Sequence, residues 1–210
     1  MRRFVATWWA AAMLGASAIA VTLPSPVAAQ GGSTSQGYQL IQATRQRDLQ
    51  KAVTMLREAP GTLVNTRDGD TGETPLAIAV GRRDLVWTRA MLGFRADPNI
   101  ANRAGVTPLM TAAFLGFSEG ADLLLRLGAR VNAVNNQGES ALHLAVQRGD
   151  VAMVRLLLDA RADPNLQDRI AGLSPIDYAR RDARLAQIAS LLETRRAAAA
   201  PSARPVQGPR

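Results

Sequence analysis

The chain has few side chains that could act as nucleophiles, bases or metal ligands. It contains one histidine, His143, and no cysteine among 210 residues, which excludes thiolate chemistry, disulfides and zinc–thiolate sites. The 17 acidic residues are dispersed, and we find no Gly-rich phosphate loop, nucleophile elbow or paired-histidine motif. We therefore predict no catalytic residue, no cofactor and no metal site, and we expect that the chain is not an enzyme.

The residues around His143 belong to a pattern that recurs along the chain. Four similar segments start at glycines spaced 33, 33 and 34 residues apart: Gly72-Glu73-Thr74-Pro75-Leu76, Gly105-Val106-Thr107-Pro108-Leu109, Gly138-Glu139-Ser140-Ala141-Leu142 and Gly172-Leu173-Ser174-Pro175-Ile176. A second marker has the same period of 33: Ala96-Asp97-Pro98-Asn99, Ala129-Arg130-Val131-Asn132 and Ala162-Asp163-Pro164-Asn165. Markers that stay in phase over this length predict a stack of repeated structural units.

Each unit has the residue types of two short helices joined by a turn. Thr74 is suited to cap the first helix, because its side chain can accept a free N–H group, and Pro75 fits the first helical position. Gly149 allows the turn to a second helix. In the Asp-Pro-Asn triplets, Pro98 fixes φ and Asn99 is expected to accept the left-handed region. One such pair of helices cannot bury its own apolar face, so neighbouring units must stack.

At these residues the sequence resembles the ankyrin-repeat family. The Thr-Pro-Leu-His-x-Ala signature of that family is matched by Thr74-Pro75-Leu76 and best by Ala141-Leu142-His143-Leu144-Ala145. The resemblance implies an all-α solenoid of helix-turn-helix units, in which the His143 imidazole hydrogen-bonds the loop backbone. Trp87 aligns with Met153 on the second helix, so we interpret it as a core residue rather than a ligand-stacking one.

The predicted stack has about five repeats, including degenerate caps, over residues 37–194. The expected boundaries are 37–68, 69–101, 102–134, 135–168 and 169–194. Residues 30–36 are interpreted as a flexible linker and residues 195–210 as a disordered basic tail. One extra residue between Asn165 and Gly172 predicts a longer loop in the last unit.

The net charge of +8 lies mainly in the two ends of the chain. Six of the 25 basic residues fall there, and without them 19 basic residues face 17 acidic ones. This balance is too weak to indicate binding along a phosphate backbone. We therefore expect no nucleic-acid partner.

The first 29 residues have the pattern of a secretory signal peptide. Two arginines precede an apolar stretch over residues 5–23, Pro24-Ser25-Pro26 breaks any helix, and Ala28-Ala29 supplies the small residues of a cleavage site before Gln30. The alternative is a retained membrane anchor, because the apolar stretch approaches the roughly 20 residues that span a bilayer. Abundant arginine with a single lysine indicates a GC-rich bacterial genome, so the expected destination is the periplasm.

The resemblance implies that a partner protein binds a concave face formed by the first helices and the loops before them. In the middle repeat, Val106, Phe114 and Leu115 are apolar at positions that usually face solvent, and arginines take the slot of Leu115 in the repeats on either side. An apolar centre bordered by arginines is typical of an interface hot spot. The alternative is that Phe114 and Phe117 fold back as packing.

The expected partner is another exported protein, and the chain itself is expected to be a monomer without stable membrane insertion once the signal is cleaved. The predicted partner-binding residues are Arg82, Arg103, Val106, Phe114, Leu115, Gln147, Arg148 and Arg181.

Overall fold

The computed structural model describes residues 35–59, 61 and 63–199. Within that part, the elements are ten α-helices and one 3-10 helix, and there is no strand. The helices fall into five pairs along the chain, which confirms the predicted all-α stack of five units.

The first helix of each pair directly follows a serine or threonine. These helices are α1 Gln36–Gln46, α3 Pro75–Gly81, α5 Pro108–Leu115, α7 Ala141–Arg148 and α9 Pro175–Arg181. The Thr74 side chain accepts the N–H of Ala77, and Ser140 and Ser174 make the same bond in later units. This bond satisfies a backbone donor that the helix itself leaves free, so the repeated residue sets where each helix starts.

The second helix of each pair begins differently. These helices are α2 Leu49–Glu58, α4 Leu85–Gly93, α6 Ser118–Arg126, α8 Val151–Asp159 and α10 Ala186–Ala199, which the 3-10 helix Ala183–Leu185 precedes. Asp48, Asp84 and Asp150 cap the first, second and fourth of them. In α6 the N-cap residue is Phe117, which makes no side-chain cap bond and is buried. The middle repeat therefore replaces a capping carboxylate with an aromatic core residue.

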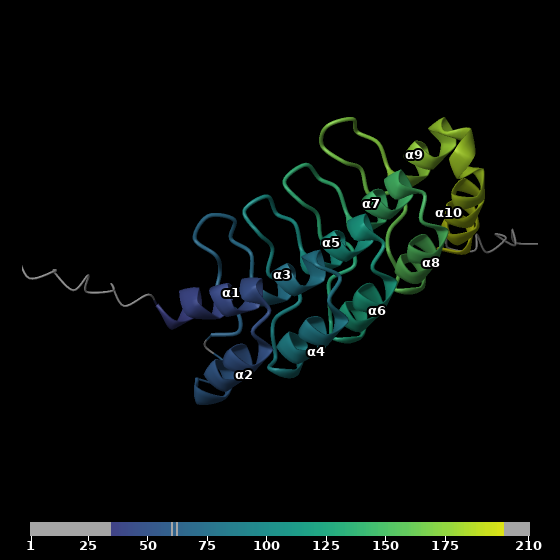
Figure 1. The fold of residues 1–210 in the computed structure, drawn as a ribbon. Helices are drawn as coiled ribbons and strands as arrows, with labels where there is room; N and C mark the ends of the chain where they lie inside the picture. Colours follow the sequence, from purple (N-terminus) through teal and green to yellow (C-terminus); the bar gives the residue numbers. More distant parts are fainter. Residues whose placement is uncertain (1–34, 60, 62, 200–210) are drawn as a thin grey trace, which may run out of the picture. The chain divides into compact units, whose positions relative to one another are not determined.

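The first helices of residues 35–199 lie side by side in one row and the second helices in another, as Figure 1 shows. Apolar residues between the rows form one continuous core from Leu40 in α1 to Leu192 in α10. Trp87 is 5% exposed in this core, in agreement with its predicted packing role. Each pair thus buries its apolar face against its neighbours, as expected for a stack.

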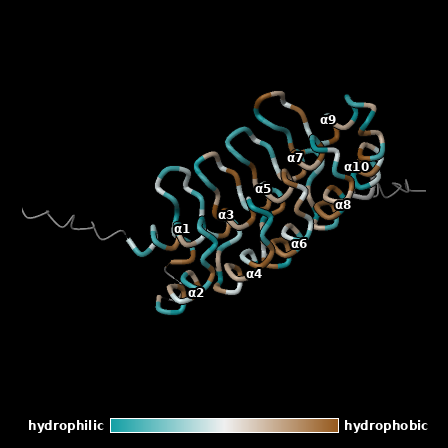
Figure 2. The backbone as a smooth tube through the Cα atoms, viewed as in Figure 1, coloured by the Kyte–Doolittle hydropathy of each residue, from teal (hydrophilic) through white to brown (hydrophobic). Residues whose placement is uncertain are grey.

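Finger loops, defined as the connections that precede α3, α5, α7 and α9, project from the row of first helices (Figure 1). Adjacent fingers are joined by backbone hydrogen bonds from Arg103 N to Thr71 O, from Asn136 N to Ala104 O and from Arg169 N to Gln137 O. The loop before α9 has a hydrophobic stretch along its tip (Figure 2), where the Ile170 side chain is 74% exposed.

Two fingers are longer than the others, whereas only the last one is predicted to be longer. The Asp168 N–H donates to Leu173 O across the last finger, and the Asp68 N–H donates to Glu73 O across the first. In the third unit the corresponding bond, from Asn102 N to Val106 O, closes a shorter loop. The sequence indicates the longer length of both fingers. Asn65 precedes Gly72 by seven residues, and Asn165 precedes Gly172 by the same number.

The asparagines of the loops after the second helices do not adopt the left-handed conformation that we predicted for Asn99. Among the described residues, the non-glycine residues with positive φ are four arginines, including Arg95 and Arg161 just before these loops. The Asn99 side-chain oxygen instead accepts the N–H of Arg130 in the next repeat at 2.7 Å. Asn65 and Asn132 make the same contact, so this asparagine joins repeats rather than forming a turn.

The predicted ends of the stack need one correction. Helix α10 continues to Ala199, so residues 195–199 are helical rather than part of a disordered tail. Arg195 forms an ion pair with Asp159 of α8, which ties this last turn to the preceding repeat. The predicted signal peptide, the rest of the tail and nearly all of the predicted linker lie outside the described residues. None of the helices in the described part is long and apolar enough to cross a membrane.

Candidate functional site

The predicted partner-binding residues lie on or beside one surface, the exposed side of the five first helices and the finger loops. We call this surface the concave face. At its centre, the Phe114 side chain at the end of α5 is 61% exposed, and Leu115 is partly buried. Phe117 is 4% exposed and packs over Gly120, where an added Cβ would clash with its ring. Only Phe117 therefore folds back as packing, and Phe114 faces outward.

Two residues from the second finger contribute to the fold more than to the exposed surface. Val106 is partly buried and packs against the core, so it is not the open apolar residue that we predicted. The Arg103 side chain is exposed, but its guanidinium donates to Gly69 O in the preceding finger. This bond adds to the contacts that align the fingers.

Arg82 and Arg148 have a structural role that their residue type and position do not predict. The Arg82 guanidinium donates to Thr44 O and Arg45 O at the end of α1, the latter at 2.8 Å. In the same way, Arg148 donates to Phe114 O at 3.1 Å. Each arginine satisfies carbonyl groups at the end of the preceding first helix, where the helix dipole favours a positive charge. Arg148 lies beside Phe114 through this bond, whereas the Arg82 guanidinium is directed to the end of α1. Part of the donor capacity of both side chains is used within the stack.

The arginine contact is missing between α3 and α5. Leu115 takes the place of the arginine there, and Gly81 at the end of α3 has no side chain. An added Cβ on Gly81 would meet no atom within 4 Å, so the surface next to Phe114 is open. On the other side of Phe114, a hollow of about 210 Å³ is lined by Phe114, Leu144, Gln147 and Arg148. The apolar centre is thus accessible from both sides.

The remaining predicted residues lie towards the C-terminal end of the row. Gln147 is exposed and donates to Glu139 Oε1 at 3.0 Å, which holds its amide at the edge of the hollow. Arg181 is exposed at the end of α9 and has no ion pair among the described residues. Arg181 therefore has its full set of N–H donors available to a partner.

His143 is fully buried and connects two repeats. The Ser140 N–H donates to its Nδ1 at 3.1 Å, and its Nε2 lies 3.2 Å from Leu173 O in the next finger. Because a backbone N–H can only donate, Nδ1 is the acceptor and Nε2 carries the proton. Both nitrogens are occupied by the backbone, so the imidazole has the loop-bonding role that the resemblance implied and no free nitrogen for a substrate.

Burial lowers the pKa of His143, although the Leu173 carbonyl opposes this shift. The folded protein therefore resists protonation of a group that has a pKa of about 6.5 in an unfolded chain. We expect the free energy of unfolding to fall as pH is lowered below about 6.5, by up to about 1.4 kcal/mol per pH unit, because only the unfolded state takes up the proton. Urea titrations between pH 5 and 7.5 would measure this slope, and His143→Gln should lack it.

Two aspartates stabilise the finger loops that border this surface. The carboxylate of Asp68 accepts N–H groups of its own loop and pairs with Arg45 at 3.0 Å. Asp168 is buried, and burial opposes its ionisation. The Ala171 N–H and the Tyr178 hydroxyl outweigh this effect and hold its pKa below the usual value. Both carboxylates are thus engaged within the fold.

In the part of the chain that the structure describes, no group of three or more His, Asp or Glu residues could hold a metal ion.

Comparison with known proteins agrees with this geometry. The family profile described as "Ankyrin repeats (3 copies)" matches residues 40–135 and 88–168, more than half of the chain. The chain belongs to the ankyrin-repeat family. Ankyrin repeats generally mediate protein–protein interactions, and the family is typically non-enzymatic.

Two relatives match about half of the chain. It is 34% identical over 107 residues to human transient receptor potential cation channel subfamily A member 1, covering 46% of this chain and 10% of the channel. It is 38% identical over 105 residues to an ankyrin repeat-containing protein of Treponema pallidum (strain Nichols), covering 50% of this chain and 35% of that protein. Because the chain covers only about a third or less of these relatives, they support the family rather than a specific partner.

Proposed function

We propose that this chain is a non-catalytic binding module or scaffold, which holds another exported protein on its concave face in the periplasm. The observation that carries the proposal is the 61% exposure of Phe114 at the centre of that face. A large aromatic side chain there is typical of a binding anchor, because burial by a partner removes its apolar surface from water.

Contacts around Phe114 support the proposal, because they keep the anchor in place. Arg148 bonds the Phe114 carbonyl, and Phe117 fixes the following turn in the core. A partner would therefore meet a surface that is largely formed before binding, which reduces the loss of conformational entropy on association.

Affinity capture from periplasmic extract tests the proposal. The bait is tagged protein from residue 30 onwards, and the comparison is the Phe114→Glu/Leu115→Glu variant. We expect a protein that the first bait retains and the second loses, because two carboxylates would oppose burial of the apolar centre. Val86→Glu is the matched control, since Val86 is an apolar side chain with 64% exposure on α4, in the row of second helices. Capture of the same proteins by every bait would contradict the proposal.

The location in the periplasm rests on the signal-peptide pattern of residues 1–29. The alternative function is a membrane-anchored adaptor that keeps its apolar N-terminal segment. N-terminal sequencing of the purified protein distinguishes the two, and we expect the mature chain to begin at Gln30. A chain that still begins at Met1 and partitions with membranes would favour the anchored adaptor.

A further inference from the structure

The first helices, which form the floor of the concave face, are basic. Their charged side chains, apart from the buried His143, are four arginines and a single carboxylate, that of Asp177. Asp177 Oδ2 accepts hydrogen bonds from the Ser174 N–H and hydroxyl, and these bonds hold its pKa below the usual value. This carboxylate is therefore engaged in capping α9. The floor has an excess of positive charge, although residues 37–194 as a whole carry 19 basic and 17 acidic residues.

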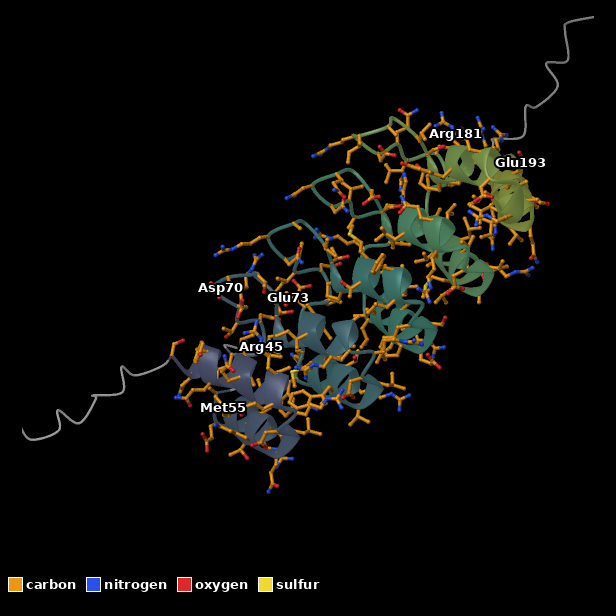
Figure 3. All side chains as sticks on the ribbon, turned by 45° about the horizontal axis from the view of Figure 1, so that its top comes forward. Arg45, Met55, Asp70, Glu73, Arg181 and Glu193 are labelled. Atoms are coloured by element: carbon orange, nitrogen blue, oxygen red, sulfur yellow. The ribbon has the colours of Figure 1, made fainter. Side chains whose placement is uncertain are left out.

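The arginines lie on both sides of Phe114. Arg45 near the first finger and Arg181 on α9 lie towards opposite ends of the row of first helices (Figure 3). Arg45 is paired with Asp68, whereas Arg181 has no ion pair in the described part. Arg180 forms an ion pair with Glu193 of α10 at 2.9 Å, so its guanidinium is less available to a partner than that of Arg181.

The turns after the first helices add more guanidinium groups. Arg47 and Arg82 follow α1 and α3, near Arg45. Burial, followed by the charge of Arg47, lowers the pKa of Arg82; Arg45 adds to this effect, and Asp84 opposes it. Like charges are therefore crowded at this end of the floor, and a negative charge supplied from outside would relieve their repulsion.

The acidic residues of the same turns are used within the stack. They accept backbone N–H groups at the start of the following helical element, and they are Asp48, Asp84, Asp150 and Asp182. On the finger side, charges of both signs occur, and Asp70 and Glu73 lie on the first finger (Figure 3). Near the hollow, the carboxylate of Glu139 accepts hydrogen bonds from Gln147 and Asn135. The excess of positive charge thus lies on the floor and turns, and the carboxylate of Glu139 is bonded to Gln147, which lines the hollow.

We infer that the concave face binds an acidic protein segment with an apolar anchor. The anchor side chain enters the hollow beside Phe114 and Leu144, and carboxylates on either side of it meet Arg47 and Arg82 at one end and Arg181 at the other. The inference rests on the proposed function and adds the chemistry of the partner. Charge complementarity of this kind selects partners and speeds association, while the apolar contact supplies most of the affinity.

Selection from a phage-displayed library of random dodecapeptides tests the inference. The immobilised protein is the chain from residue 30 onwards, which contains all five helix pairs. We expect enriched peptides in which an aromatic or aliphatic residue is flanked by Asp and Glu. Affinity of one enriched peptide is then measured by fluorescence anisotropy, and it should weaken as NaCl is raised.

Four variants separate the contributions. Phe114→Glu should weaken peptide binding by about tenfold or more, and Arg181→Glu by about threefold to tenfold. Val86→Glu, which lies outside the concave face, should leave affinity unchanged. Glu139→Gln should strengthen binding, because it removes the carboxylate next to the hollow. Circular dichroism of each variant checks that the helices are retained.

The outcomes distinguish this inference from the proposed function. Enrichment of basic or uncharged peptides that still require Phe114 would overturn the acidic partner and leave the concave face as the binding site. Acidic peptides that bind Phe114→Glu as well as the parent would overturn both. No enrichment, or equal competition by single-stranded DNA, would also overturn the inference, because the face would then lack a protein-segment site or bind any polyanion.

Discussion

Replacement of His143 with alanine should lower the free energy of unfolding by about 3 kcal/mol at pH 7.5. The imidazole is fully buried, so its loss leaves a cavity between the fourth and fifth repeats. It also leaves the Ser140 N–H and the Leu173 carbonyl without their partner, and buried polar groups without partners are strongly destabilising. We expect a larger effect than for most single substitutions, because the cavity and the unpaired polar groups lie at the same interface between repeats.

Urea unfolding followed by circular dichroism measures this loss. His143→Gln should be less destabilised, since its amide also has an acceptor and a donor. Gln147→Ala, an exposed change on the same helix, should lose less than about 1 kcal/mol. Hydrogen exchange should show increased opening of α9 and α10 rather than of α3 and α4, because each repeat contacts only its neighbours. A loss for His143→Ala similar to that of Gln147→Ala would show that the imidazole contacts contribute little.

Local signals in the sequence predicted most of the fold. Thr74, Ser140 and Pro75 mark helix starts because capping and the missing proline N–H act within a few residues. The regular spacing of such residues then predicts stacking, and with it the burial of Trp87. The exposure of Phe114 follows from its place at the end of a first helix. These features depend on position within one repeat, so a single sequence is sufficient to predict them.

Contacts between repeats were harder to predict. Arg82 and Arg148 reach carbonyl groups more than 30 residues earlier in the chain, and residue type alone does not show which way a guanidinium points. The burial of Val106 against the core also depends on packing with neighbouring units. Asn99 was assigned to a turn because asparagine favours turns, whereas its side chain bonds the next repeat. In each case a long-range contact overrode the local preference.

The first finger shows a different kind of error. The extra residue between Asn65 and Gly72 does not affect the glycine spacing, because that spacing starts at Gly72, after this loop. Only the pattern that begins at Asn65 shows that the first and last fingers have the same longer length. Each marker of the repeat therefore has its own spacing, because the loops between successive markers differ in length.

Substitution of Gly105 by alanine should lower the free energy of unfolding by about 2–3 kcal/mol, the second large effect that we expect. Gly105 has a φ of 76°, where a Cβ is strained. The added Cβ would also lie 2.8 Å from Asn136 N, whose N–H donates to Ala104 O between fingers. The substitution therefore combines local strain with loss of a contact between repeats.

Gly172→Ala separates the backbone strain from the loss of the finger contact, because Gly172 precedes α9 of the last repeat and has no following finger beside it. Its φ is 64°, but an added Cβ would meet no atom within 4 Å. We expect a loss of about 1 kcal/mol from the backbone strain alone. Urea unfolding of both variants gives the difference, which measures the finger contact between the third and fourth repeats. Equal losses would show that the fingers separate easily and that the recurring glycine serves only its own turn.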